Sequence, residues 1–122
     1  MTVVNLHQRT RLPATTRLSP NREPRRHNAP ADMLILHYTA MAGGAEAVDW
    51  LCLPASKVSC HYLVDDDGSI VQMVDEADRA WHAGVAHWAG ENDINSRSIG
   101  IEIQNGAEAA GWPDYPDRQM RT

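Results

Sequence analysis

The stretch SIGIEIQ, residues 98–104, decides the fold, because its run of isoleucines predicts a buried β-strand. One carboxylate, Glu102, interrupts that run, although burying an unpaired charge is costly. Strand alternation places Glu102 on the face opposite its flanking isoleucines, alongside Gly100, which leaves space for a ligand. A carboxyl in such a pocket has a raised pKa, as a general base needs. The structural alternative is a salt bridge to Arg79 or Arg97.

The segment AWHAG, residues 80–84, precedes this strand and holds Trp81 and His82 in a Gly-bounded turn. A Trp-His pair can bind a polar ligand, stack on a sugar or contribute a metal ligand. The same pair can also do no more than staple the loop. We therefore take both side chains as candidates for binding substrate.

A second apolar run, MLILHYT at residues 33–39, predicts a central strand buried on both faces. His37 lies near its end, where sheet proteins commonly place ligands, and neutral imidazole is a frequent zinc ligand. The alternative for His37 is a core histidine bonded to Thr39 or to a backbone carbonyl. His61, in a further predicted strand, either lines the same sheet face or is structural.

The other predicted elements follow from hydrophobic periodicity and turn residues. They are a short helix after Gly43-Gly44 bounded by Pro54, a strand over 58–64, a hairpin turn over 65–68, a returning strand over 69–74, one helical turn over 75–80, a long loop over 83–97 and a helix beginning near Asp117. The predicted fold class is α/β, with a mixed central β-sheet flanked by helices.

The charge of the 122-residue chain, −5 overall, is unevenly distributed. Residues 1–30 contain six arginines and one glutamate, whereas residues 31–122 contain five basic and fifteen acidic residues. We expect an extended basic arm over 1–30, with an organelle transit peptide as the alternative, and a single domain over 31–122. The acidic body argues against nucleic-acid binding.

Targeting signals and cysteines indicate the cellular location that we expect for the protein. No run approaches the roughly 20 apolar residues of a membrane span, and the first 30 residues lack the apolar core of a secretory signal. We therefore expect a cytoplasmic protein with no membrane span. Cys52 and Cys60 are expected to be free, buried thiols. The sequence does not predict an oligomeric state.

Five segments in order give the chain a resemblance to a known family, the zinc-dependent N-acetylmuramoyl-L-alanine amidases of the second amidase class, which is related to the peptidoglycan recognition proteins. They are SPN at Ser19, LILHYTAM at Leu34, SCHYLVDDDGSIVQMV at Ser59, RAWHAG at Arg79 and NSRSIGIEIQN at Asn95. The resemblance covers roughly residues 17–120.

The resemblance implies an enzyme that hydrolyses the amide between the lactyl group of muramic acid and L-alanine in peptidoglycan or muropeptides. It implies that His37 is the first zinc ligand, that Glu102 is the catalytic acid/base, and that Trp81 and His82 help to form the muropeptide groove. The family's other zinc ligands follow a further helix, so we expect them beyond Thr122. The chain then resembles the N-terminal portion of an amidase domain.

Two alternatives follow, because residues 1–122 would then contain only one of the family's zinc ligands. The first is a non-catalytic peptidoglycan-binding module, or an inactive fragment, that lacks a complete zinc site. The second is a self-contained metal site built from His37, His82 and either His61 or Glu102. A sheet that lacks a covering helix would also expose an apolar patch, so we expect marginal stability of this form.

Overall fold

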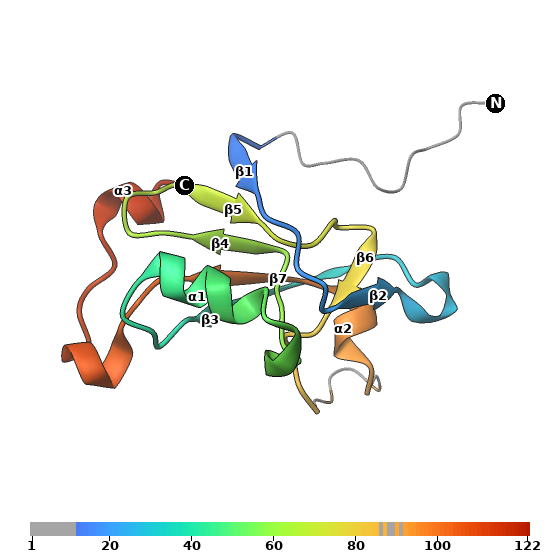
Figure 1. Cartoon of the computed structure of the whole chain (residues 1–122). Coiled ribbons are helices and arrows are strands. Elements are labelled where there is room, and N and C mark those ends of the chain that lie inside the picture. The colour runs from blue at the N-terminus through green and yellow to red at the C-terminus, as the bar shows by residue number, and fades with distance from the viewer. Residues whose placement is uncertain (1–11, 86, 88–89, 91) are drawn as a thin grey trace.

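A five-stranded mixed sheet forms the centre of the molecule in the computed structural model, which describes residues 12–85, 87, 90 and 92–122 (Figure 1). The strand order is β1-β5-β4-β7-β3; β4 and β5 are antiparallel, and the other neighbouring pairs are parallel. The strands are β1 (Ala14–Thr16), β3 (Met33–Tyr38), β4 (Tyr62–Val64), β5 (Ile70–Gln72) and β7 (Ser98–Ile103). This architecture confirms the predicted α/β fold with a mixed sheet.

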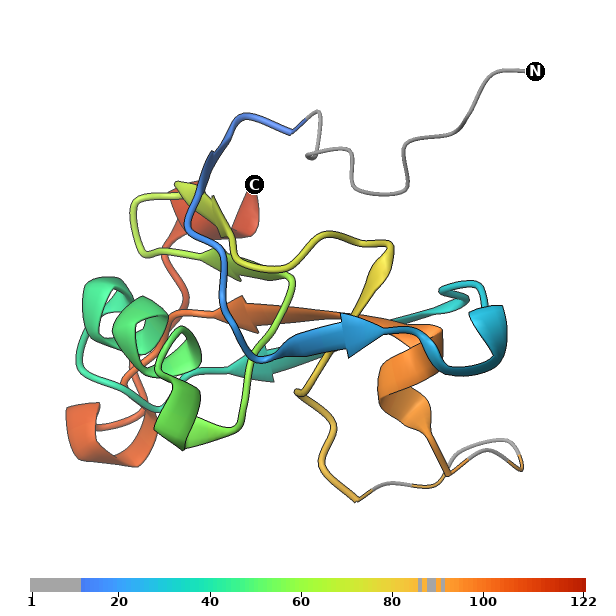
Figure 2. The same cartoon turned by 45° about the vertical axis from the view of Figure 1, so that its right-hand side comes forward.

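A two-stranded antiparallel ribbon, β2 (Arg22–Pro24) with β6 (Asp78–Ala80), lies beside the main sheet (Figure 2). The helices are α1 (Gly44–Leu51), α2 (Ile94–Arg97) and α3 (Asp117–Met120), and single 3₁₀ turns occupy Arg26–Asn28, Pro54–Ser56 and Ala107–Ala110. The short helix after Gly43-Gly44 and the helix beginning at Asp117 are therefore confirmed.

One face of the sheet packs against α1 because the apolar positions of that helix recur at helical spacing. Their burial forms a core cluster with side chains of β4 and its neighbours: Ala47, Val48, Leu51, Cys60, Leu63 and Met73. The hairpin between β4 and β5 is also as predicted, and Gly68 adopts the positive φ of 86° that its turn requires.

The opposite face of the sheet is exposed along β3, whereas Tyr62 of β4 and Ile70 of β5 are buried on that face. The prediction that strand 33–39 is central and buried on both faces is wrong. β3 is an edge strand that pairs with β7, and its side chains alternate between half-buried and exposed. Leu34 and Leu36 are 62% and 61% exposed. They line an apolar groove of about 390 Å³ together with isoleucines of β7. This groove is the exposed apolar patch that the sequence led us to expect.

Three other boundaries differ from the sequence predictions. The strand predicted over 58–64 is reduced to β4, because the backbone N–H of Ser59 bonds to the Trp81 carbonyl outside the sheet. The helical turn predicted over 75–80 is wrong, since its last residues form β6 against β2. The predicted loop 83–97 contains α2, whose first turn is capped by the Asp93 side chain.

The described part of the predicted arm, residues 12–30, contributes β1 and β2 to the two sheets. Residues 1–11 lie outside the described residues, and the division of the chain at residue 30 stays a prediction. Both cysteines are free, with Cys60 buried and Cys52 only partly so. In the part of the chain that the structure describes, every helix is too short or too polar to cross a bilayer.

Candidate functional site

Glu102 lies near the end of β7 and faces the α1 side of the sheet. Its register partners are His37 on β3 and the fully buried Leu63 on β4, so strand alternation gives all three the same face. The buried Oε2 atom of Glu102 has no hydrogen-bond partner among the described residues. Burial raises the pKa of this carboxyl from 4.5 to about 7.

The structural alternative for Glu102 is therefore wrong, because both candidate arginines bind other carboxylates. Arg79 donates to Glu23 and Asp93, and Arg97 donates to Asp32. A carboxyl with an unpartnered oxygen and a pKa of about 7 can take up and release a proton at neutral pH.

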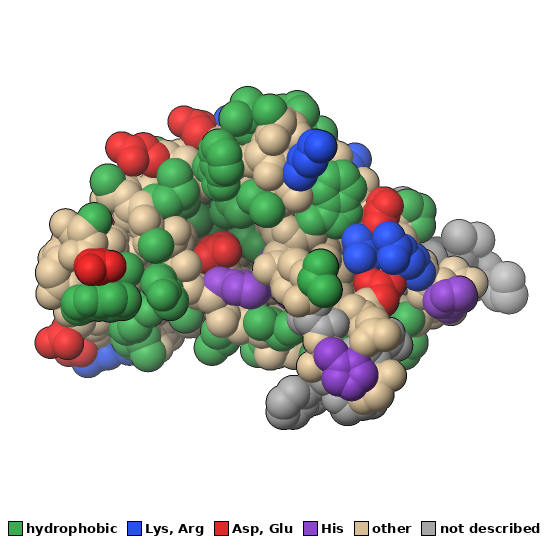
Figure 3. All heavy atoms as spheres, turned by 90° about the horizontal axis from the view of Figure 1, so that it is seen from below, with side chains coloured by type: hydrophobic (Ala, Val, Ile, Leu, Met, Phe, Trp, Pro, Cys, Tyr) green, Lys and Arg blue, Asp and Glu red, His purple; other side chains and the backbone are tan. Residues whose placement is uncertain are grey.

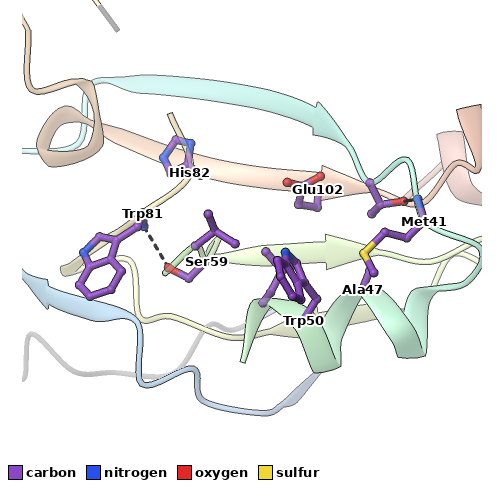
Figure 4. A pocket seen from close by; sticks show the side chains of 10 residues that line it. Met41, Ala47, Trp50, Ser59, Trp81, His82 and Glu102 are labelled. Carbon is purple, nitrogen blue, oxygen red and sulfur yellow. Dashed lines mark hydrogen bonds between the residues drawn. The ribbon is translucent and has the colours of Figure 1, made fainter. Parts of the chain in front are cut away.

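A hollow of about 500 Å³ opens in front of Glu102. Figure 4 shows Glu102 and His82 along one wall, with Trp50 of α1 on the other. On the face seen in Figure 3, acidic and histidine side chains lie next to each other, with hydrophobic side chains around them. The lining residues are Thr39, Met41, Ala47, Trp50, Leu51, Val58, Ser59, Trp81, His82 and Glu102. The mixture of aromatic, apolar and few polar groups is typical of a ligand site.

The turn that carries Trp81 and His82 is held in place by side chains from two other segments. The backbone N–H of Trp81 donates to Ser59 Oγ over 2.9 Å (Figure 4). Asn95 Oδ1 accepts from the backbone N–H groups of His82 and Ala83 at 3.1 and 2.9 Å. Since Asn95 is buried, these two hydrogen bonds fix the turn against the start of β7.

The His82 ring occupies the space that the sequence assigned to a ligand. A Cβ atom at Gly100 would lie 2.5 Å from Cγ of His82, so only glycine allows this close approach. Burial lowers the pKa of His82 to about 3, and the neighbouring His37 adds to the effect. The imidazole is therefore neutral at physiological pH.

His37 lies beside His82, with 2.9 Å between His37 Nε2 and His82 Nδ1. This contact replaces the predicted alternative of a bond to Thr39, which instead donates to Gln104. Burial lowers the pKa of His37. His37 lines a neighbouring hollow with Ala83, whereas His82 lines the hollow in front of Glu102.

His61 is structural, as one of its two alternatives proposed. Its Nδ1 accepts from the Gly100 N–H at 3.0 Å, and its Nε2 donates to the Asp78 carbonyl at 2.9 Å. Burial lowers its pKa to about 4. Arg25 packs against the same ring and donates to the carbonyls of Glu76, Asn95, Ser96 and Ser98.

The idea of a self-contained metal site is wrong for the described residues, which form no group of three or more potential ligands. Both ring nitrogens of His61 bond to backbone groups, and both of His82 bond to side chains. They are therefore not free to ligate a metal. His37 differs from these two histidines, because its Nδ1 has no hydrogen-bond partner among the described residues, which do not form a complete zinc site.

Sequence reasoning missed the residues that support the site. Asn95 and Ser98 lie in a segment that resembles the family, and Arg25 lies in the predicted basic arm, but the sequence predicts no role in the site for any of them. Their roles depend on hydrogen bonds between segments that are up to 73 residues apart in the chain. The local signal was the presence of uncharged polar residues next to an apolar strand, which is too common to predict a contact.

Comparison with known proteins identifies the class. A family model described as "Amidase_2: N-acetylmuramoyl-L-alanine amidase" matches residues 27–122. This match covers most of the chain, and the chain therefore belongs to the N-acetylmuramoyl-L-alanine amidase family.

Two curated relatives from Escherichia coli illustrate the match. The chain is 37% identical to the N-acetylmuramoyl-L-alanine amidase AmiD over 87 residues, covering 66% of this chain and 29% of AmiD. It is 42% identical to the 1,6-anhydro-N-acetylmuramyl-L-alanine amidase AmpD over 64 residues, covering 52% of this chain and 34% of AmpD. The matches thus span about a third of the length of these relatives.

Solved structures support the same assignment. The crystal structure of a selenomethionine AmpD derivative superposes with a TM-score of 0.75 at 29% identity, covering 88% of this chain and 68% of that one. The complex of E. coli AmiD with anhydro-N-acetylmuramic acid-L-Ala-D-γ-Glu-L-Lys superposes with a TM-score of 0.66 at 30% identity, covering 81% and 42%. The fold around Glu102 is therefore the amidase fold.

Proposed function

We propose that this chain carries part of the active site of an N-acetylmuramoyl-L-alanine amidase. The reaction is hydrolysis of the amide that joins the lactyl group of muramic acid to L-alanine in a muropeptide. The observation that carries the proposal is Glu102, a carboxyl with a buried, unpartnered oxygen and a pKa of about 7 in a hollow of ligand size.

In this proposal Glu102 handles the proton of the reaction. As a carboxylate it accepts a proton from the attacking water, and as a carboxylic acid it returns that proton to the departing amine of L-alanine. A pKa of about 7 leaves both forms populated near neutral pH. Trp81 and Trp50 offer aromatic faces for the sugar or the peptide, and the His82 ring forms part of the same wall.

The proposed cofactor is zinc, with His37 as the ligand that this chain supplies. Zinc in such a site would provide Lewis-acid chemistry at the amide carbonyl. Because the described residues lack a complete donor set, the remaining ligands of this proposal come from outside them. The incomplete set also favours a second candidate function, a module that binds muropeptides without cleaving them.

The proposed substrate is a soluble anhydro-muropeptide and the proposed location is the cytoplasm. The similarity to AmpD, whose name specifies a 1,6-anhydro-muramyl substrate, supports this choice, as does the similarity to AmiD, whose solved complex contains an anhydro-N-acetylmuramic acid peptide as substrate. Intact peptidoglycan is the alternative substrate. Hydrolysis of an anhydro-muramoyl tripeptide compared with intact sacculi separates the two substrates.

The test is a Glu102→Gln variant assayed with zinc for release of the stem peptide, measured by mass spectrometry. Gln keeps the size of the side chain but cannot accept a proton, so we expect turnover to fall about 10²- to 10⁴-fold. Glu108→Gln, which replaces an exposed carboxylate, is the matched control and should keep full activity.

Unchanged turnover in Glu102→Gln would refute the proposed role of Glu102. Binding of the tripeptide by calorimetry, with no turnover by the wild-type chain in the presence of zinc, would instead establish the binding module.

A further inference from the structure

His82 and Ser98 lie behind His37 and are connected to it by a chain of hydrogen bonds. The proposed function gives this chain of hydrogen bonds no role. His37 Nε2 lies 2.9 Å from His82 Nδ1, and His82 Nε2 lies 2.9 Å from Ser98 Oγ. Ser98 Oγ in turn donates to the carbonyl of Ile94 over 2.8 Å. The chain therefore ends on a backbone group.

That backbone group sets the direction of every bond before it. A carbonyl can only accept, so the single hydroxyl proton of Ser98 is directed to Ile94. Ser98 Oγ can then only accept from His82, which places the proton of the neutral His82 ring on Nε2. A neutral imidazole carries one N–H, so His82 Nδ1 is left as an acceptor.

The acceptor at His82 Nδ1 requires a donor at His37. The neighbouring nitrogen, His37 Nε2, must therefore be protonated, and the lone pair of the His37 ring lies on Nδ1. His37 Nδ1 has no hydrogen-bond partner among the residues that the structure describes. We infer that Ser98 and His82 are positioning residues that hold His37 in its Nε2–H tautomer and leave Nδ1 as the free ligand atom.

The His82 ring is itself held against rotation, as a relay of this kind requires. Gly100 provides the space in which the ring lies, and Asn95 bonds to the backbone at His82. His61 in turn fixes the backbone N–H of Gly100. Side chains that orient a metal-binding histidine through its second nitrogen commonly change metal affinity 10- to 100-fold when they are removed.

The inference depends on the proposed function only for the role of His37 as a ligand. The tautomer itself can be measured without metal, substrate or turnover, by long-range ¹H–¹⁵N correlation spectra of the imidazole nitrogens in the ¹⁵N-labelled chain. These spectra distinguish a protonated from an unprotonated ring nitrogen. A failed amidase assay therefore leaves this test unaffected.

In the wild-type chain at mildly alkaline pH, we expect His37 and His82 each to show a protonated Nε2 and an unprotonated Nδ1. Ser98→Ala removes the acceptor for His82 Nε2–H, so both rings should shift towards a mixture of tautomers. Ser96→Ala is the matched control, because the Ser96 hydroxyl bonds to Asp93 and not to a histidine. His61 is the internal reference, since backbone groups fix its tautomer.

Two results would overturn the inference. One is a wild-type His37 with its proton on Nδ1, which is decisive even if Ser98→Ala does not fold. The other is a folded Ser98→Ala variant in which His37 and His82 keep the wild-type tautomers.

Discussion

Replacing Glu102 by Gln should raise the unfolding free energy of the protein at neutral and alkaline pH, but not at acidic pH. Burial raises the pKa of Glu102 from 4.5 to about 7, so the folded protein holds a proton that the unfolded chain releases. As the pH rises from 4.5 to about 7, ionisation therefore favours unfolding, and the wild type loses stability. Gln stays neutral, so the variant escapes this loss.

The size of the effect follows from the pKa difference. A shift from 4.5 to about 7 corresponds to at most about 3 kcal/mol of unfolding free energy. The carboxyl is only partly buried, so solvent screening reduces this to about 1–2 kcal/mol. We expect Glu102→Gln to equal the wild type near pH 4.5 and to exceed it by this amount at about pH 8.

The assay is urea unfolding of both proteins, followed by circular dichroism in the presence of EDTA at each pH. Other titrating groups cancel in the difference between the two proteins, so the pH dependence of that difference reports on Glu102 alone. Glu108→Gln, which replaces an exposed carboxylate, should show no comparable pH dependence. A difference between Glu102→Gln and the wild type that stays constant with pH would refute the raised pKa, and with it the acid/base argument.

The remaining predictions concern the interior and the open sheet face. Arg25→Met removes the donor from up to four backbone carbonyls and should lower the unfolding free energy by about 2–4 kcal/mol. Arg17→Met, at an exposed ion pair, should change the unfolding free energy much less. Equal losses in denaturant unfolding would contradict this. Leu36→Lys should reduce binding of the dye ANS to the apolar groove with a stability change within about 0.5 kcal/mol, while Leu63→Ala, in the core of the other face, should cost about 2–5 kcal/mol. Undiminished dye binding by Leu36→Lys would show that the groove is not the apolar surface that the dye detects.

The sequence by itself determined the parts of this protein that depend on local pattern. The alternation in SIGIEIQ was sufficient to place Glu102 on one face of a strand and the neighbouring isoleucines on the other, as β7 shows. Apolar spacing predicted α1, and the Asp-Gly turn predicted the β4–β5 hairpin. These features follow from the periods of helices and strands, which are visible in a short window.

Only the tertiary structure decided which segments meet. Whether β3 is a central or an edge strand depends on its neighbours, and whether residues 78–80 form a helix or a strand depends on pairing with β2. The contacts of Glu102, the position of the His82 ring over Gly100 and the bonds through Ser98 likewise join residues from separate segments. Packing and hydrogen bonding between distant segments are not encoded in local periodicity, so the protonation of the site could be worked out only once those segments were in place.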